Sequence, residues 1–322
     1  MNGPAAGTGR VKYDALPPAT GGGRSGWPAE GDAARDLGSI ALQTARTVAA
    51  AAGLVRDGKV FSLNAPIDAF GHQQWGRTLV RHDVVHPEGT LFFDDVLDRF
   101  ALQGSSQWDS LGHVGYAAGQ WFGGATEDDV RSGRRNTIEH WARRGIAGRG
   151  VLLDMQGLWA DRGLVLEPFA PEHFTVEDLE AARERSGLEY RSGDILLLHT
   201  GFAAAFGELT VDGRTAMELT SPGLAHNESI CRYLWDHGFS AVASDNLAVE
   251  AFPADFSAAA APFGAMHRML IGQLGLALGE LWWLAGLVDD CRADNRWEMF
   301  VTSAPLHVPG GIGSPANALA IK

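Results

Sequence analysis

The run D-I-L-L-L-H-T at residues 194–200 is the clearest strand in the chain, and the segments around it decide the fold. Four apolar residues in a row, closed by the breaker Gly201, are typical of a strand buried on both faces. Downstream, residues 227–237 have the pattern of a helix that ends at Gly238, and residues 240–244 form a second short apolar run. This strand–helix–strand order predicts an α/β protein.

The segments upstream of that run extend the same alternation. Thr175 is followed three residues later by Asp178, a capping pair that predicts a helix up to residue 185. The run G-V-L-L-D at residues 150–154 predicts another buried strand. Apolar residues at helical spacing over residues 33–52, closed by a glycine, predict one helix. The whole pattern favours a mixed central sheet flanked by helices.

Composition narrows the class of protein. Residues 1–32 are rich in Gly, Pro and Ala, so we expect a flexible arm, or one that wraps a neighbouring surface, before a single domain over residues 33–322. A net charge of −13 argues against nucleic acid and anionic membranes as partners. The sequence shows no signal peptide and no apolar window of ~18 residues, and it has only two cysteines. We therefore expect a protein of the reducing cytoplasm.

Two nucleotide-binding motifs do not occur in the sequence context that they require, and one catalytic motif is absent. No G-x-G-x-x-G or G-x-x-x-x-G-K-[ST] stands between a strand and a helix, which argues against dinucleotide-binding and P-loop proteins. No G-x-S-x-G is present either, which disfavours a serine hydrolase. The chemistry must therefore come from another pattern.

The polar stretch L-Q-G-S-S-Q-W-D-S-L-G-H at residues 102–113 supplies that pattern. In an extended segment, Gln103, Ser105, Gln107 and Asp109 would share one face, because strand side chains alternate. Burying such groups without partners costs ~1–3 kcal/mol each, so a ligand or a metal ion would have to supply the partners. The alternative is a solvated loop with a capping Ser or Asp.

This stretch resembles the metal-binding signature of the cyclase-type amidohydrolases, a family that includes kynurenine formamidase and isatin hydrolase. The signature reads His, one residue, Gly-Thr-His, one residue, Asp, one residue, Pro, one residue, His. With Asp109 as the fixed point, its last histidine corresponds to His113, whereas Gln103 and Gln107 replace the two earlier histidines. The chain is most similar to a branch that reads Gln-Trp-Asp here, and the resemblance extends from about residue 60 to the C-terminus.

The resemblance also implies a role as metal ligands for His267 and Glu280. From the residues alone, His267 starts a helix and Glu280 is a solvated carboxylate. In the family, a His-Arg pair opens this segment, a Glu follows about a dozen residues later, and both are metal ligands. The fold implied is the swivelling β/β/α type. Asp245 and Glu250 are expected to lie near the site as supporting residues.

The resemblance implies a metal-dependent hydrolase of a small cyclic amide, lactone or formamide-like substrate. Asp109, His267 and Glu280 would bind one divalent ion, and Asp109 would also orient the attacking water. Amide oxygens of Gln103 and Gln107 as further ligands would favour Mn²⁺, with Zn²⁺ or Mg²⁺ as alternatives. His113 would act as general acid or base. Two alternatives stay open: a cyclase or dehydratase using the same site, and a metal-free ligand-binding protein.

Aromatic residues around this stretch complete the expectations. Trp108, Tyr116, Trp121 and Phe122 would either form an apolar wall for a flat substrate or simply pack. Phe92 and Phe93, together in the preceding segment, are expected to plug the core beneath the site. The family resemblance further implies a homodimer or homotetramer.

Overall fold

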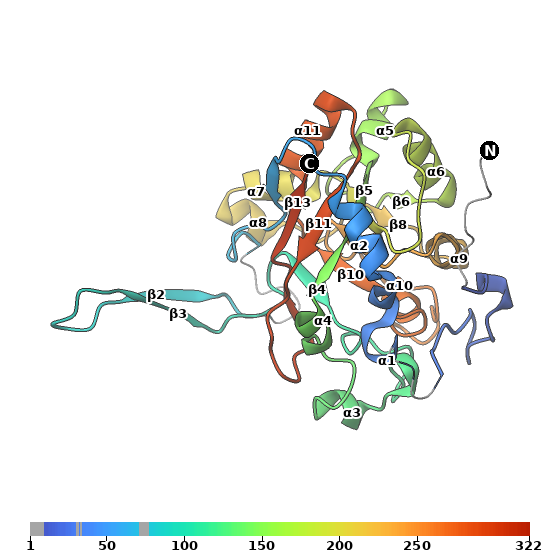
Figure 1. Cartoon of the computed structure of the whole chain (residues 1–322), viewed down its shortest axis with the longest axis horizontal. Coiled ribbons are helices and arrows are strands. Elements are labelled where there is room, and N and C mark those ends of the chain that lie inside the picture. Colours follow the sequence, from blue (N-terminus) through green and yellow to red (C-terminus); the bar gives the residue numbers. More distant parts are fainter. Residues whose placement is uncertain (1–9, 30–31, 33, 71–76) are drawn as a thin grey trace.

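The computed structural model describes residues 10–322 except 30–31, 33 and 71–76, and it is built on one nine-stranded mixed sheet (Figure 1). This confirms the α/β class with a mixed central sheet flanked by helices. From edge to edge the strands are β1 (Val60–Ser62), β13 (Ala318–Ile321), β11 (Glu298–Ser303), β5 (Ile146–Asp154), β7 (Ile195–His199), β9 (Ala241–Ser244), β10 (Ala277–Glu280), β4 (Gln107–Asp109) and β12 (Gly313–Pro315).

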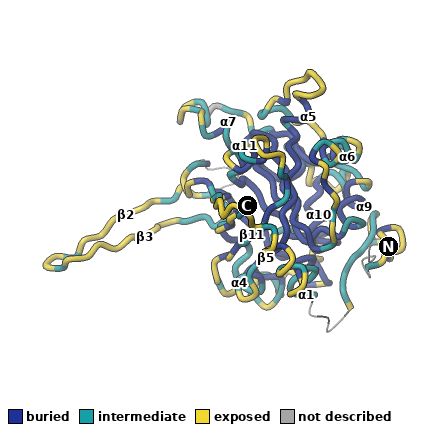
Figure 2. The backbone as a smooth tube through the Cα atoms, turned by 45° about the horizontal axis from the view of Figure 1, so that its top comes forward, coloured by how far each residue is buried: buried dark blue, intermediate teal, exposed yellow. Residues whose placement is uncertain are grey.

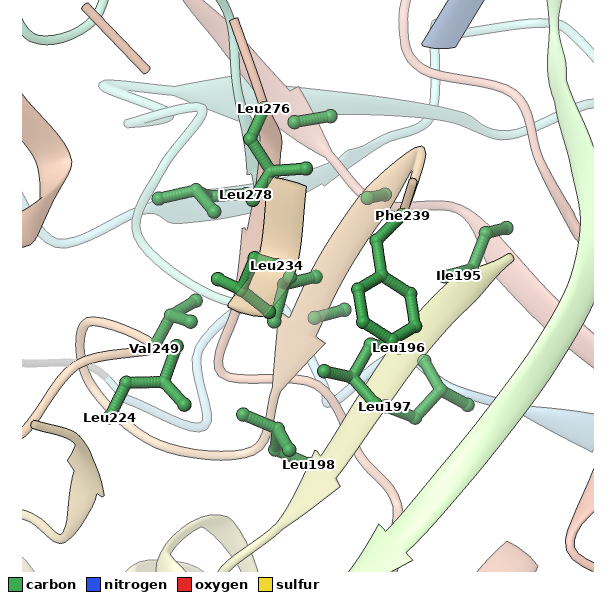
Figure 3. Close-up of a cluster of buried hydrophobic side chains, with 14 of the residues drawn as sticks. Ile195, Leu196, Leu197, Leu198, Leu224, Leu234, Phe239, Val249, Leu276 and Leu278 are labelled. Atoms are coloured by element: carbon green, nitrogen blue, oxygen red, sulfur yellow. The ribbon is translucent and has the colours of Figure 1, made fainter. Parts of the chain in front are cut away.

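Four adjacent strands in the middle of the sheet, β5, β7, β9 and β10, run parallel, and the other pairings in this sheet are antiparallel. The apolar run Ile195–Leu198 of β7 is fully buried and packs in a cluster with Leu234 of helix α9 (Glu228–His237) and with Phe239 (Figure 3). Helix α9 is capped by the side chain of Asn227 and ends at Gly238, as its sequence predicts.

The remaining helices connect and cover these strands. Helix α6 begins with the predicted capping box of Thr175 and Asp178. No helix among the described residues is long and apolar enough to cross a bilayer. The helices are α1 (Ala34–Leu37), η2 (Gly38–Leu42), α2 (Ala45–Ala52), η4 (Phe122–Gly124), α3 (Glu127–Arg131), α4 (Glu139–Arg144), α5 (Met155–Asp161), α6 (Val176–Arg185), α7 (Phe202–Glu208), α8 (Val211–Ala216), α10 (Met266–Leu270) and α11 (Ala285–Asp294).

The single helix expected over residues 33–52 is wrong, because the chain breaks there into α1, η2 and α2. Gly38 adopts φ +56°, and a Cβ at this position would lie 2.2 Å from the carbonyl oxygen of Gly275. A left-handed glycine in close contact with another backbone cannot continue an α-helix. Thr44 then starts α2 by accepting a hydrogen bond from the amide of Thr47.

The N-terminal segment over residues 10–29 lies against the body of the protein. It contains the short helix η1 (Tyr13–Ala15), and the Tyr13 side chain is fully buried. The indole of Trp27 donates a hydrogen bond to the Gly272 carbonyl at 2.8 Å, and Tyr116 donates to the Gly22 carbonyl at 3.0 Å. These contacts attach residues 22 and 27 to the body of the protein, and residues 1–9 lie outside the described part of the chain.

Two strands stand apart from the sheet, β2 (Arg81–Val85) and β3 (Asp94–Asp98). They form a hairpin that projects far from the body (Figure 1) and is exposed along its length (Figure 2). Phe92 and Phe93 lie at its tip and are 53% and 66% exposed. The expectation that they plug the core is therefore wrong, because the hairpin carries them away from the sheet. The other small sheet pairs β6 (His173–Phe174) with β8 (Gly223–Leu224).

A buried polar network lies where β5 ends. The Asp154 carboxylate contacts His199 Nδ1 at 3.0 Å and accepts hydrogen bonds from the Arg292 guanidinium and the Gly157 amide. Burial opposes ionisation, but the His199 and Arg292 hydrogen bonds hold the pKa of Asp154 well below its usual range. The ionised carboxylate therefore stabilises the folded state.

We expect Asp154→Asn to lower the free energy of unfolding at pH 7 by about 2 kcal/mol, because it removes the charge that pairs with Arg292. Since the folded-state pKa is depressed, the wild-type advantage should be full above about pH 4 and should shrink below it. Urea unfolding of both proteins at pH 7 and pH 3 measures this. Asp161→Asn, at an exposed carboxylate, serves as the control; an equal loss in both variants would contradict the role of the buried network.

Candidate active site

Strands β4 and β10 bring the first site residues together. They pair antiparallel, so Gln107 lies directly opposite Glu280, and its amide donates a hydrogen bond to the Glu280 carboxylate at 2.5 Å. Asp109 lies two residues along β4 and so shares this face. The predicted alternation is therefore seen for Gln107 and Asp109, while the Ser105 hydroxyl instead donates to the Pro66 carbonyl.

Helix α10 adds the imidazole of His267. Its Nε2 lies 2.9 Å from Glu280 Oε1 and 3.7 Å from Asp109 Oδ2. One potential ligand atom from each of these three residues lies within 4.8 Å of the other two, and all three residues are buried. Glu280 is therefore not the solvated carboxylate that its local sequence suggests. Pairing with β4 turns it into the interior.

Glu250 holds the other side of the His267 ring. Its Oε2 lies 3.0 Å from His267 Nδ1, which leaves Nε2 directed at Asp109 and Glu280. A carboxylate that accepts the Nδ1 hydrogen fixes the ring and makes the other nitrogen a better metal ligand. Of the two expected supporting residues, only Glu250 contacts the three-residue cluster; Asp245 instead accepts hydrogen bonds from the Thr200 and Gly201 amides.

We expect Glu250→Gln to weaken Mn²⁺ binding about tenfold, because the neutral amide is a poorer acceptor for the Nδ1 hydrogen. Isothermal titration with Mn²⁺ on chelator-stripped protein measures the change. Glu172→Gln, at an exposed carboxylate, is the matched control. Unchanged affinity in Glu250→Gln would remove this residue from the site.

The site concentrates negative charge in the interior. Burial, followed by the nearby Asp109 charge, raises the pKa of Glu280 to about 7. Burial also opposes ionisation of Asp109, but the imidazoles of His113 and His267 and the Gln103 amide lower its pKa to about 2. Although burial works against it, the surrounding carboxylates, Glu250 first, raise the pKa of His267 well above its usual value. Three carboxylates around one imidazole form an environment that stabilises a cation.

Two buried hydrogen-bond acceptors indicate whether these residues suit a metal ion. Asp109 Oδ2 and Gln107 Oε1 have no hydrogen-bond partner within the described part of the chain. Buried acceptors without partners are rare in folded proteins and indicate a missing water or ion. Carboxylate and amide oxygens with one imidazole suit a divalent cation, and this oxygen-rich set favours the harder ions. The donor set therefore fits a single divalent metal.

Gln103 connects Asp109 to His113. Its amide nitrogen lies 2.6 Å from Asp109 Oδ1 and 2.9 Å from His113 Nδ1. The Asp109 carboxylate can only accept, so it fixes the NH₂ group of Gln103 toward both residues. His113 Nδ1 is then an acceptor, and the neutral ring carries its hydrogen on Nε2. Burial lowers the pKa of His113, which favours this neutral form.

A cavity of about 190 Å³ opens beside these groups. His113, Glu250, His267 and Glu280 lie on its polar side, together with Arg77. The apolar side was not foreseen; the aromatic pattern A-F-P-A-D-F at residues 251–256 was its only signal in the sequence. The apolar lining residues are Val114, Leu247, Ala248, Phe252, Ala254 and Phe256.

The four aromatic residues considered for a substrate wall are not part of this lining. Trp108 points to the other face of β4, where it is fully buried, packs edge-on against Trp141 and Trp282, and donates a hydrogen bond to Ser303. Tyr116 and Phe122 are buried in the core, and Trp121 is partly buried. The structure thus places Trp108, Tyr116 and Phe122 in the packing that supports the site.

Comparisons with known proteins agree with this architecture. The family described as "Putative cyclase" matches residues 61–251. A crystal structure described as a novel cyclase is 31% identical, with a TM-score of 0.78, over 89% of this chain and 96% of that one. An isatin hydrolase bound to the product analogue thioisatinate is 16% identical with a TM-score of 0.60, over 86% of this chain and 98% of that one. Isatin hydrolase A from Ralstonia solanacearum is also 16% identical, with a TM-score of 0.59, over 85% of this chain and 96% of that one. No curated protein matches the chain.

Proposed function

Because the chain belongs to the cyclase family, we propose that it is a metal-dependent hydrolase that opens a small cyclic amide or lactone. One observation carries the proposal. The ligand atoms of Asp109, His267 and Glu280 converge within 4.8 Å, next to a cavity with a polar and an apolar side. The two buried acceptors without partners, on Asp109 and Gln107, support a bound cation at this point.

Asp109, His267 and Glu280 would hold the ion, with the Gln107 amide oxygen available as a further ligand. A divalent ion here supplies Lewis acidity toward the carbonyl oxygen and lowers the pKa of water. The oxygen-rich ligand set favours Mn²⁺, with Mg²⁺ or Zn²⁺ as alternatives. Glu250 keeps the His267 ring in place, and Gln103 keeps His113 in its Nε2–H form.

His113 is the proton donor in this proposal. Hydrolysis adds the hydroxyl of water to the carbonyl carbon and breaks the C–N or C–O bond, and the leaving atom takes up a proton. The His113 imidazole lines the cavity, and in this step it takes up the proton that water releases and passes it to the leaving atom, so that the ring is neutral again at the end. The product is a carboxylate, and the Arg77 guanidinium on the cavity lining offers it a counter-charge.

Turnover assays of the purified protein test the proposal. Isatin, N-formylkynurenine and simple lactones are each incubated with chelator-stripped protein, with and without Mn²⁺, and hydrolysis is followed by absorbance and mass change. We expect the addition of one water to at least one substrate, only with metal present. A metal-dependent product without added water would instead favour a cyclase or dehydratase. Ligand binding with neither metal uptake nor turnover would favour a metal-free binding protein.

A further inference from the structure

One loop, residues 251–265, contributes Phe252, Ala254 and Phe256 to the apolar side of the cavity beside His267, and it is called here the Phe256 loop. The loop begins directly after Glu250 and ends directly before helix α10, which carries His267. The contact of 3.0 Å between Glu250 and His267 therefore holds the two ends of the loop together. The middle of the loop needs other contacts to keep its place at the cavity.

The two aromatic residues of this loop are held in different ways. The backbone of Phe252 exchanges two hydrogen bonds with Ser221, at 2.9 and 3.1 Å, and its side chain packs against the apolar cluster that includes Phe202. The side chain of Phe256 is 50% exposed, so packing contributes little to its position. The place of Phe256 on the cavity lining therefore depends on what holds its backbone.

Arg268 in helix α10 supplies that support. Its guanidinium donates hydrogen bonds to the carbonyl oxygens of Phe256 and Ser257, the latter at 3.2 Å. The same group lies 5.6 Å from the centre of the Phe256 ring, within range of a cation–π contact. Among the described residues, Arg268 is the only one outside the loop that forms a hydrogen bond with residues 253–263.

Hydrogen bonds inside the loop make the turn around Phe256 a single unit. The Asp255 amide donates to the Gly264 carbonyl at 2.7 Å, and the Asp255 carboxylate accepts a hydrogen bond from the Ser257 amide at 2.8 Å. Because these contacts limit the movement of the turn within itself, two consecutive carbonyl groups held by one planar guanidinium also fix the direction of the Phe256 side chain.

We propose that Arg268 is a positioning residue, which holds the Phe256 loop at the cavity and thereby sets a preference for substrates with an apolar group away from the reacting carbonyl. The inference rests on the proposed function, which makes this cavity the substrate site. With Arg268 in place, Phe256 removes such a group from water when the substrate binds. Without Arg268, the loop is free to move outward and the group stays hydrated. One turn of α10 thus positions both His267 and the apolar wall.

The binding of two lactones tests the proposal. γ-Butyrolactone and γ-octalactone share the same ring, and the second carries a butyl chain in addition. Their affinities are measured by saturation-transfer NMR on the full-length, chelator-stripped protein, so the measurement does not require turnover. We expect the wild type to bind γ-octalactone at least about tenfold more tightly than γ-butyrolactone. Equal affinities would overturn the proposal.

Arg268→Ala should lose most of this preference, at least about fivefold, while its affinity for γ-butyrolactone stays within about twofold of the wild type. Arg268→Lys should restore much of the preference, because an ammonium group can still donate to both carbonyls. Arg183→Ala is the matched control, since Arg183 donates to the Leu188 carbonyl and lies 6.0 Å from the Tyr190 ring centre, outside the cavity lining. An unchanged preference in Arg268→Ala, or an equal loss in Arg183→Ala, would overturn the role of Arg268.

A double variant separates positioning from a general effect on the fold. Phe256→Ala should lose the preference with Arg268 intact, and adding Arg268→Ala to it should change the preference no further, because both changes remove the same wall. Additive losses would contradict the proposal.

Turnover of the same lactones with Mn²⁺ tests the proposed function separately. A preference in binding that depends on Arg268, without hydrolysis, would refute the hydrolase and keep the role of Arg268. Hydrolysis by a protein whose preference survives in Arg268→Ala would do the reverse.

Discussion

Replacing Asp109 with asparagine is expected to reduce turnover at least about 100-fold, because it removes a charged ligand from the centre of the site. Asparagine has the same shape and can still accept the hydrogen bond from Gln103, so the fold should be retained. In wild-type protein, Mn²⁺ should raise the melting temperature, since a ligand that binds only the folded state stabilises it. In Asp109→Asn that rise should largely disappear.

Metal content by mass spectrometry, turnover and thermal melting together identify the cause of the loss. Ser110→Ala is the matched control, because Ser110 is equally buried and adjacent in sequence, and its hydroxyl contacts the Gly112 amide. That control should keep both metal and activity. Full activity in Asp109→Asn would remove Asp109 from the mechanism. Lost activity with undiminished metal would reassign it from holding the ion to orienting water.

Replacing His113 with alanine should lower turnover by about 10²–10⁴-fold while metal content stays close to that of the wild type. The physical reason lies in its position: His113 Nε2 is 3.8 Å from Asp109 Oδ1, and Nδ1 is already bound by Gln103. The ring thus borders the cluster of Asp109, His267 and Glu280 without belonging to the group that converges within 4.8 Å. Its loss should affect proton transfer more than ion binding.

Steady-state kinetics with metal analysis on the same preparations checks this. His237→Ala on α9 serves as the control for loss of a histidine elsewhere in the protein and should be near wild-type. Parallel loss of metal and rate in His113→Ala would make His113 a ligand. An unchanged rate would require another proton donor on the cavity lining.

Local signals in the sequence predicted the local structure well. Helix α6 begins at the predicted capping pair of Thr175, and helix α9 has the predicted boundaries Asn227 and Gly238. Such caps can be predicted from sequence because they depend on hydrogen bonds within one turn. The apolar run at residues 195–198 is a buried strand for a similar reason, since nothing polar in it needs solvent. The break at Gly38 could not be foreseen, because it depends on contact with Gly275, a residue distant in the chain.

Burial was predicted less well where it depends on partners. Phe92 and Phe93 are apolar and adjacent, which suggested a core, but sequence alone does not say which surface covers them. Glu280 shows the opposite case. Its local sequence predicts an exposed carboxylate, but the pairing of β10 with β4 buries it. For Trp108, the alternation along β4 already places it opposite Gln107 and Asp109, so the strand parity itself contained the information that it faces the core.

The central triad of Asp109, His267 and Glu280 could be named only through family resemblance, since no spacing rule links residues so far apart. Glu250 was suspected from its place after β9, but its contact with His267 required the fold. The cavity wall around Phe252 and Phe256 was missed entirely. A loop that forms an apolar surface gives no periodic signal.

The placement of β4 has a consequence for biosynthesis. In the sheet, its three residues pair only with β10 and β12, both of which are translated much later than β4. Residues 107–109 therefore emerge from the ribosome long before any strand exists to hydrogen-bond with them. The candidate catalytic centre must stay unassembled until β10 has been synthesised, and a truncated chain ending before residue 277 cannot form it.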